Sequence, residues 1–451
     1  MPKKNGPRAG NRQRRSSLPI PGSSEAKVSK TKASSSSNGS GNSKKSAPKI
    51  AAPQDEPRAP SPSVSDEATT ARQQLALNVF KSTFGAVLSS PSFSSTLQSV
   101  KQALFDRDFA RAFASNEYLE VYAARYSPTR ALCYASVLAG IHHHLYAISS
   151  EPGQEDDGPA PRSPSAPSPL PRTLRHLSIG GGAAETVAFA AYLKDIQSTT
   201  PMRGTMHLLD SAAWGTVVSS LTNTLTTPSH LSSSSSEDSD TPFIPPSLFQ
   251  ATFTQQDAFS QSRSTLRHLL NPPCTTATKT TPKQKQKQKP IPILTTLLFT
   301  LNELFTAGGI GKTTRLLLDL TSEIPIGSLL LVVDSPGSYS ETAVGKGNAS
   351  ANEKEAKRSY PMKWLLDRIM LGTRTEPVNG RMWRKLESCD SVWFRFLSGT
   401  STGLLSGLGS GTTTGTVEYP IPLENMRYQM HLYVAEAAAD GDGDGDEEEQ
   451  G

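Results

Sequence analysis

Residues 174–196 read LRHLSIGGGAAETVAFAAYLKDI, and this stretch decides the fold that the sequence predicts. Its first six residues suit a buried strand, Gly180, Gly181 and Gly182 form a turn, and the alanine-rich remainder suits a helix. Glycines at such a turn let the backbone approach a ligand at the helix N-terminus. The stretch therefore predicts the first strand, turn and helix of a cofactor-binding sheet.

Strands and helices alternate along the rest of the chain, which indicates an α/β fold with a parallel sheet covered on both faces. Helical patterns follow most of the expected strands, and YPMKWLLDRIML (360–371) is one of them. The later strands are expected to end at Asp210, at Asp257, at Asn302–Glu303 and at Asp334, with the two last strands at CDSVWFRFL (389–397) and MRYQMHLYV (426–434).

The basic charge of the chain belongs to its first 50 residues. These residues contain 12 Lys/Arg and one acid, Glu25, so they contribute +11, and the overall +5 leaves −6 for the other 401 residues. The clusters PKK and RQRR are typical of a nuclear-entry signal or an RNA-tethering arm, and a solubilising tail explains them equally well.

Composition divides the chain into a folded body and low-complexity segments. Ser, Gly, Pro and Lys dominate the basic tail, which cannot bury enough apolar surface to fold. The expected units are a disordered tail (1–70), a helical N-terminal subdomain (71–148), a linker (149–172), an α/β domain (173–434) with insertions near 229–242, 275–290, 341–356 and 398–416, and a disordered acidic tail (435–451).

Membrane, disulfide and metal signals are weak in this sequence. No apolar run of about 18 residues exists, so we expect no membrane span. The three cysteines (Cys133, Cys274 and Cys389) are far apart, which favours a reducing compartment. HHH (142–144) cannot aim three consecutive imidazoles at one ion, and DGDGDG (440–445) lacks the closing Glu of a calcium loop at Gly451, so no metal is expected.

The strand ends predict a nucleoside site. Gly180–Gly182, Asp210 and Asp257 follow three successive strands, and open parallel sheets bind ligands at that edge. An acid after the second strand can accept hydrogen bonds from ribose hydroxyls, and an acid after the third can meet a base edge. Each of these residues could alternatively serve only as a turn former or a helix cap.

The stretch GGIGKTT (308–314) competes with this interpretation. Gly311, Lys312 and Thr313 match the second half of a phosphate-binding loop, with Asp334 as a magnesium ligand, and would indicate an ATPase or GTPase. The first glycine of that motif, however, falls at Thr306. We therefore interpret GGIGKTT as a structural turn that opens the helix after the fourth strand.

The chain resembles the fungal large-subunit (25S) rRNA (uridine-N3)-methyltransferases, which depend on S-adenosyl-L-methionine. The resemblance extends over about residues 126–434, with low-complexity insertions between the matching stretches. These stretches are YSPTRALCYA (126–135), LSIGGGAAETVAFA (177–190), FTLNELFT (299–306), LLLVVDSPGSYSE (329–341), YPMKWLLD (360–367) and EYPIPLENMRYQMHLYV (418–434).

The resemblance implies a class I methyltransferase (Rossmann-like) fold, a seven-stranded mostly parallel sheet whose last strand is antiparallel. It assigns Gly180 and Gly182 to the methionine end of the cofactor, Asp210 to its ribose and Asp257 to its adenine side. Ser178 and Ala184 replace an acid and a glycine that are usual in the class, and Glu185 is expected to add polarity there. The implied partner is ribosomal RNA in a pre-60S particle, bound by a monomer in the nucleus or nucleolus, with the cytoplasm left open.

Candidate substrate and catalytic residues follow from the proposed chemistry. Glu303 is the candidate base for uridine N3, with Asn302 as its orienting neighbour, although Glu303 could also be a helix-capping acid. Tyr419 and Tyr428 are further candidates for stacking on a base. The candidate substrate contacts are Asp334, Ser335, Tyr339, Arg130 and Arg427. A non-catalytic RNA-binding assembly factor that keeps a relic methyltransferase fold remains the second alternative.

Overall fold

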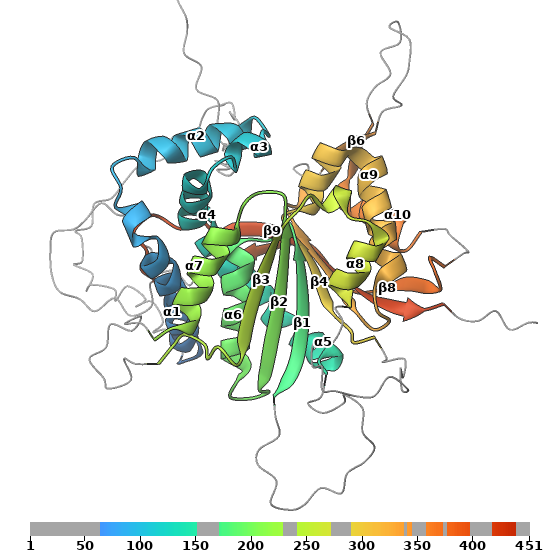
Figure 1. Cartoon of the computed structure of the whole chain (residues 1–451), viewed down its shortest axis with the longest axis horizontal. Coiled ribbons are helices and arrows are strands. Elements are labelled where there is room, and N and C mark those ends of the chain that lie inside the picture. The colour runs from blue at the N-terminus through green and yellow to red at the C-terminus, as the bar shows by residue number, and fades with distance from the viewer. Residues whose placement is uncertain are drawn as a thin grey trace, which may run out of the picture.

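The structure is a computed structural model that describes residues 64–150, 171–228, 241–271, 290–337, 341–344, 358–372, 377–396 and 417–438. A seven-stranded sheet forms its centre, in the order β3-β2-β1-β4-β5-β9-β8 (Figure 1). Its strands are β1 (Arg172–Ile179), β2 (Met202–Asp210), β3 (Phe249–Gln255), β4 (Leu294–Leu298), β5 (Leu329–Asp334), β8 (Arg381–Phe394) and β9 (Met426–Ala437).

Strand directions confirm the predicted architecture. β1 to β5 pair in parallel, and β9, the last strand in the chain, lies antiparallel between β5 and β8. Two strands were not predicted. β6 (Glu341–Val344) and β7 (Arg358–Pro361) form a separate antiparallel pair. The first four residues of the segment expected as an insertion at 341–356 therefore belong to a strand.

Helices cover both faces of the sheet (Figure 1). One face packs against α1 (Val64–Leu88), α4 (Asn116–Gly140), α6 (Ala183–Ile196) and α7 (Gly215–Thr226), and the other against α8 (Arg263–Leu270), α9 (Leu301–Glu323) and α10 (Met362–Met370). The remaining helices are α2 (Phe93–Phe105), α3 (Phe109–Ala112), α5 (His142–Ile148) and the short 3-10 helix η1 (Ala258–Ser260). No described helix is long and apolar enough to cross a membrane.

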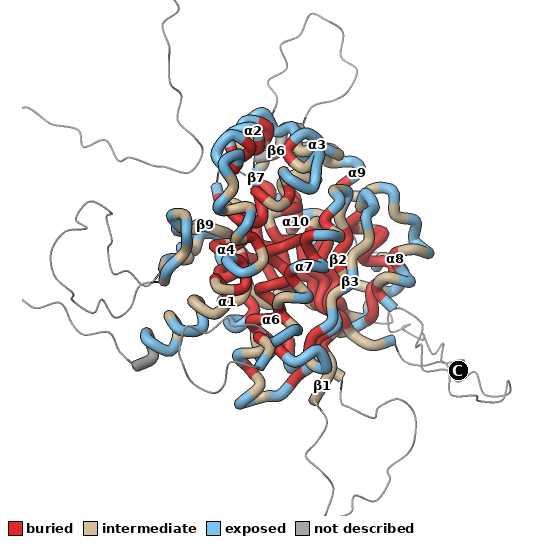
Figure 2. The backbone as a smooth tube through the Cα atoms, turned by 60° about the vertical axis from the view of Figure 1, so that its left-hand side comes forward, coloured by how far each residue is buried: buried red, intermediate tan, exposed pale blue. Residues whose placement is uncertain are grey.

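The central strands are apolar on both sides because both sides are covered. In β5, Leu329, Leu331 and Val333 join the core beneath α1, α4 and α6, while Leu330 and Val332 join the core beneath α9 and α10. All six residues of β5 are buried, which explains its uninterrupted apolar run. Figure 2 shows the buried positions concentrated along the central strands and the helix sides that face them.

The N-terminal helices differ from the prediction in one place. α1 begins at Val64, inside the segment expected to be a disordered tail (1–70). α4 runs without interruption from Asn116 to Gly140, with Pro128 inside it. These helices share one core with α6, α7 and the sheet, so the region 71–148 packs directly onto the α/β body.

α4 tolerates Pro128 because another side chain replaces the missing donor. Proline has no N–H, so the carbonyl four residues earlier, at Ala124, loses its helical partner. The hydroxyl of Tyr419 donates a hydrogen bond to this Ala124 oxygen at 2.8 Å. Tyr419, which the sequence offered as a base-stacking candidate, thus has a structural role.

Tyr419→Phe is expected to lower the free energy of unfolding by about 1–3 kcal/mol, because the Ala124 carbonyl is left without a donor. Thermal unfolding should show a Tm roughly 2–10 °C lower. Tyr428→Phe is the control, since the Tyr428 hydroxyl has no hydrogen bond to any described residue. Equal Tm values for the two variants would contradict this role for Tyr419.

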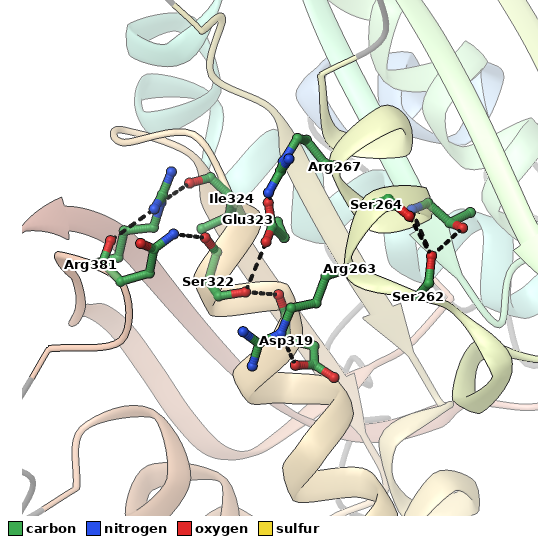
Figure 3. A network of polar contacts seen from close by, with 11 residues as sticks. Ser262, Arg263, Ser264, Arg267, Asp319, Ser322, Glu323, Ile324 and Arg381 are labelled. Atoms are coloured by element: carbon green, nitrogen blue, oxygen red, sulfur yellow. Dashed lines mark hydrogen bonds and ion pairs between the residues drawn. The ribbon is translucent and has the colours of Figure 1, made fainter.

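Arginines connect the C-terminal end of α9 to its neighbours (Figure 3). Arg263 and Arg267 of α8 each place Nε 2.7 Å from a carboxylate oxygen of Asp319 and Glu323, respectively. Arg381, at the start of β8, donates from Nε to the carbonyl oxygen of Ile324 at 2.6 Å. Both carboxylates are buried while their arginines remain largely exposed, so these contacts hold α8 and β8 in place around α9.

Candidate functional site

A cavity of about 450 Å³ opens at the carboxyl ends of β1, β2 and β4. This volume lies in the range of small-molecule sites, and the position is the one where open α/β sheets bind ligands. A second hollow of about 640 Å³, beside α7 and β3, has no titratable side chain in its lining. The polar residues that line the first cavity are Tyr122, Ser127, Arg130, Glu185, Asp210, Ser211, Asp257, Thr300, Glu303 and Lys312.

The glycine turn forms the floor of the cavity and cannot accept side chains. Gly180 has φ +74°, and a Cβ there would lie 2.3 Å from Cγ2 of Thr300. A Cβ on Gly182 would lie 2.8 Å from Cδ2 of Trp214, and one on Gly181 2.2 Å from Oγ of Ser178. The turn therefore packs too closely against these side chains for any residue but glycine, and the backbone of Gly180 and Gly182 borders the cavity directly.

Glu185 lies in the same cradle. Its Oε2 accepts a hydrogen bond from the backbone N–H of Gly182 at 2.7 Å, which is the half of a capping box that a glycine N-cap allows at the start of α6. Burial raises the pKa of Glu185 in spite of this bond. The side chain thus fixes the glycine turn and also places an acidic group on the cavity wall.

The two aspartates expected at strand ends both line the cavity, but β3 ends at Gln255, so only Asp210 lies at a strand end. Asp210 ends β2, and its Oδ1 accepts from the N–H of Ala212 at 2.7 Å. Burial, with a smaller contribution from the charge of Glu185, raises the pKa of Asp210 to about 7. Asp257 is exposed, and its Oδ1 accepts from the N–H of Phe259 at 2.9 Å, which caps η1.

Glu303 lines the cavity, but not from a strand end. β4 stops at Leu298 because Phe299 adopts a left-handed conformation, φ +56°, which ends the extended run. The expected strand end at Asn302–Glu303 is therefore wrong, and both residues lie in the first turn of α9. Burial raises the pKa of Glu303 to about 8; Arg130 lowers it, while the charges of Asp334 and Asp210 raise it further.

Asp334 lies behind the cavity wall. Its Oδ2 accepts from the N–H of Asn302 at 2.9 Å, and its Oδ1 accepts from the N–H of Ser335 at 2.7 Å. Burial raises the pKa of Asp334 to about 6 although both bonds favour the charged form. This carboxylate accepts from the N–H of Asn302 in the first turn of α9 and so positions the turn that presents Glu303.

Arg130 reaches the cavity from α4. It donates from Nη1 to the hydroxyl of Tyr122, and its guanidinium lies 5.2 Å from the centre of the Phe299 ring. Phe113 and Trp214 contact Tyr122 edge-on, with ring centres 5.1 and 5.8 Å away. Arg130 was predicted from the sequence, but these aromatic rings were not, because their helical spacing is equally typical of core residues.

Three other candidates lie elsewhere. Ser335 does not line the cavity, and its carbonyl oxygen accepts from Nε2 of Gln429 at 2.6 Å. Arg427 is exposed on β9, where its Nε donates to Oγ of Ser391 at 2.7 Å. Tyr339 lies outside the described residues.

GGIGKTT lies inside a helix. α9 begins at Leu301 and bends at Gly309. About two helical turns therefore lie between β4 and the bend, and Lys312 follows the bend. A phosphate loop needs its glycines directly between strand and helix, and the structure places none of Gly308, Gly309 and Gly311 there. The expected structural turn exists at Gly309, whose non-helical conformation joins two helices, but it does not open the first helix after β4, which begins at Leu301. A Cβ at Gly308 would lie 2.2 Å from the ring of Phe259. This glycine therefore leaves room for the Phe259 ring, which lines the cavity.

Two alanine substitutions test whether GGIGKTT forms a helix bend or a phosphate-binding loop. Gly309→Ala is expected to lower the free energy of unfolding by about 1–3 kcal/mol, because φ +68°, ψ 177° is a conformation almost restricted to glycine. Gly311→Ala is expected to raise it by up to about 1 kcal/mol, because a Cβ there meets open space within a helix. Thermal unfolding measures both, and saturable ATP binding that Lys312→Ala abolishes would contradict the helix-bend interpretation.

One group of side chains outside the cavity has the composition of a metal site. Among the described residues, ligand atoms of His143, His144 and Glu387 lie within 4.8 Å of one another. Nε2 of His144 lies 3.0 Å from Oε1 of Glu387, a hydrogen bond that accounts for this geometry without an ion. His142 points elsewhere, to the hydroxyls of Tyr192 and Thr200 at 2.9 and 3.0 Å.

The cavity suits a nucleoside cofactor that carries positive charge. It offers three acidic groups (Glu185, Asp210 and Glu303) beside the cation Arg130 in its buried part, and a cationic ligand would stabilise their ionised forms. The glycine cradle gives such a ligand close access to backbone N–H groups at the start of α6. S-adenosylmethionine, with its sulfonium, amino group and ribose diol, matches these features.

Comparison with known proteins agrees with this assignment. A family described as "Putative SAM-dependent methyltransferase" matches residues 80–434. The chain is 26% identical over 338 residues to the 25S rRNA (uridine(2843)-N(3))-methyltransferase of Saccharomyces cerevisiae, which covers 75% of this chain and 77% of the yeast protein.

The solved structures that the chain matches include two methyltransferases. The CMeT domain of the citrinin polyketide synthase is 11% identical with a TM-score of 0.34, covering 77% of this chain and 66% of that one. Loganic acid methyltransferase with SAH is 10% identical with a TM-score of 0.24, covering 48% and 57%. The family match spans the glycine cradle, Asp210 and Glu303, and the chain therefore belongs to the family of S-adenosylmethionine-dependent methyltransferases.

Proposed function

We propose that this methyltransferase modifies N3 of a uridine in large-subunit ribosomal RNA. The observation that supports this target most strongly is the similarity to the yeast 25S rRNA (uridine-N3)-methyltransferase, which extends over three quarters of both chains. The cavity adds a chemical argument, because it holds an acidic side chain suited to receive a proton from a ring nitrogen.

Glu303 is the proposed base. The uridine N3 carries a proton, and a carboxylate beside the ring would accept it as the nitrogen becomes a nucleophile. Burial gives this carboxyl a pKa of about 8, so its ionised form is a stronger base than an ordinary glutamate. Arg130 stabilises the ionised form, and Asp334 holds the helix turn that aims the side chain.

The cofactor supplies a methyl group already activated on its sulfonium sulfur. The chain's contribution is therefore mainly to position the acceptor and to exclude water. The aromatic wall of Phe113, Tyr122 and Trp214 closes the cavity on the side of α3 and α4 and gives a flat base a surface to pack against. The N3 atom lies on the pairing edge of uracil, so the target base has to be unpaired or flipped out of a duplex.

A pre-60S particle is the proposed setting. Segments of ribosomal RNA are unpaired and accessible during assembly. The first 50 residues have a net charge of +11, which would favour both nuclear entry and RNA attachment. We propose the nucleus or nucleolus as the site of action. A fluorescent fusion of the full chain, compared with one that lacks residues 1–50, tests this localisation.

Nucleoside mass spectrometry of ribosomal RNA tests the proposed reaction. RNA from a strain without the gene should lack one N3-methyluridine, and the purified chain with S-adenosylmethionine should restore it on that RNA. If RNA from the strain without the gene kept every N3-methyluridine, the proposal would be contradicted. Binding of the RNA without methyl transfer, by a chain that also fails to bind S-adenosylmethionine, would support the assembly-factor alternative instead.

A further inference from the structure

An arginine–tryptophan patch lies at the carboxyl edge of the sheet, outside the cavity. It consists of Trp393, Arg395 and Arg427, from the end of β8 and the start of β9. The Trp393 side chain is 48% exposed. The guanidinium carbons of Arg395 and Arg427 lie 5.5 and 5.8 Å from its ring centre, within the range of cation–π contacts.

The patch has a positive charge that no described carboxylate neutralises. Neither arginine forms an ion pair within the described ranges, and Arg427 is held in place by its hydrogen bond to Ser391. The two nearest acids in sequence, Asp390 and Glu424, are already paired with Lys363 and Arg125. An exposed indole ring therefore lies between two guanidinium groups that have no ion-pair partner among the described residues. It presents a flat apolar surface with positive charges at its edge.

The strand register places this patch beside the cavity. Trp393 pairs with Arg427 across β8 and β9, and two residues further along β9 Gln429 pairs with Asp334 of β5. β8 lies three strands from β4, the nearest strand that ends at the cavity, a separation of about 14 Å. Beneath this edge, Gln429 donates to Ser335 and Asp334 holds the turn of Glu303, so the patch and the cavity lie along the same edge of the sheet.

We propose that this patch is a docking site for single-stranded RNA next to the target nucleotide. The inference rests on the proposed function and extends it, since it names where the strand lies outside the cavity. The indole ring would stack on an unpaired base of any identity, and Arg395 and Arg427 would contact the adjoining phosphates. Positive charge and a position at the same sheet edge as the cavity favour RNA over a protein partner, whose docking would leave RNA affinity independent of Trp393.

Fluorescence anisotropy with a labelled single-stranded RNA containing uridine tests the docking site on the full chain. Trp393→Ala is expected to weaken RNA binding about 5- to 100-fold, and Trp393→Phe to restore most of it. Arg395→Gln with Arg427→Gln should reduce the slope of log Kd against log salt by about 0.7 per arginine. Circular dichroism checks that each variant keeps the wild-type fold.

Tyr146→Ala is the matched control. Tyr146 is 40% exposed and contacts Arg172, with the guanidinium carbon 4.7 Å from its ring centre. Arg172 begins β1, so this aromatic–arginine pair lies at the opposite edge of the sheet and its loss should leave RNA affinity unchanged. Wild-type RNA affinity in Trp393→Ala would overturn the docking site alone. Absence of any RNA binding by the wild-type chain would instead overturn the proposed function.

Discussion

Glu303→Gln is expected to lower kcat for uridine methylation by about 10²- to 10⁴-fold, the usual contribution of a general base. Glutamine fills the same space in the first turn of α9 but cannot accept the N3 proton. The Kd for S-adenosylmethionine should stay within about threefold of the wild-type value, because the glycine cradle and Asp210 are untouched. Single-turnover methyl transfer and calorimetry measure the two quantities separately.

The pH profile gives Glu303 a signature that a structural role would not produce. Its pKa of about 8 means that roughly a tenth of the side chains are ionised at pH 7 in the free chain. Only the ionised form accepts a proton, so wild-type kcat/KM should rise with pH and level off above about 8. The Glu303→Gln variant should lose this rise and keep only a low activity that follows the acidity of the substrate.

Glu120→Gln provides the control for this experiment. Glu120 lies on α4, outside the cavity, and accepts a hydrogen bond from Asn116 that glutamine can also accept. Its activity should equal that of the wild type. A Glu303→Gln variant with full activity and an unchanged pH profile would leave Glu303 as a helix residue only, and the cofactor assignment would stand.

Local signals made most of the fold predictable. A strand, three glycines and an alanine-rich helix follow one another within 23 residues at 174–196, and a parallel register then brings the end of β2 next to the turn. The run at 291–306 was misleading because apolar residues continue from β4 into α9. The left-handed conformation of Phe299 ends the strand, and a phenylalanine gives no sequence signal for that conformation.

The site was only partly predictable, because its wall comes from distant parts of the chain. The floor residues Gly180, Gly182 and Asp210 follow sheet strands, so topology places them together. Tyr122 and Trp214 meet only after α4 packs against the sheet, through contacts about 90 residues apart that no local pattern encodes. Pro128 shows the same limit, since the hydroxyl that lets α4 continue comes from Tyr419.

Asp210→Asn is expected to weaken S-adenosylmethionine binding about 10- to 150-fold, which corresponds to the loss of about 1.5–3 kcal/mol from a hydrogen bond to a charged group. The amide oxygen can still accept from the N–H of Ala212, so the loop after β2 should keep its shape. The variant nevertheless loses a negative charge and one acceptor for the ribose hydroxyls. Isothermal titration calorimetry of the full chain measures the change.

Asp195→Asn separates this role from a general effect of charge. Asp195 is an exposed acid near the end of α6, the helix that begins at the glycine cradle, and it does not line the cavity. Both variants remove one negative charge, but only Asp210→Asn should weaken cofactor binding.

The pKa of Asp210 decides the direction of the pH effect. Burial raises this pKa to about 7, so the wild-type carboxyl is protonated below pH 7 and ionised above it. A protonated carboxyl attracts a cation less and offers fewer acceptors for hydroxyl groups, so wild-type affinity for S-adenosylmethionine should increase as the pH rises through 7. The amide of Asp210→Asn cannot ionise, and its affinity should change little over the same range. Because the two curves are expected to converge in acid and diverge in base, a constant ratio of Kd values between pH 6 and pH 8 would show that the ionised carboxyl of Asp210 does not hold the cofactor.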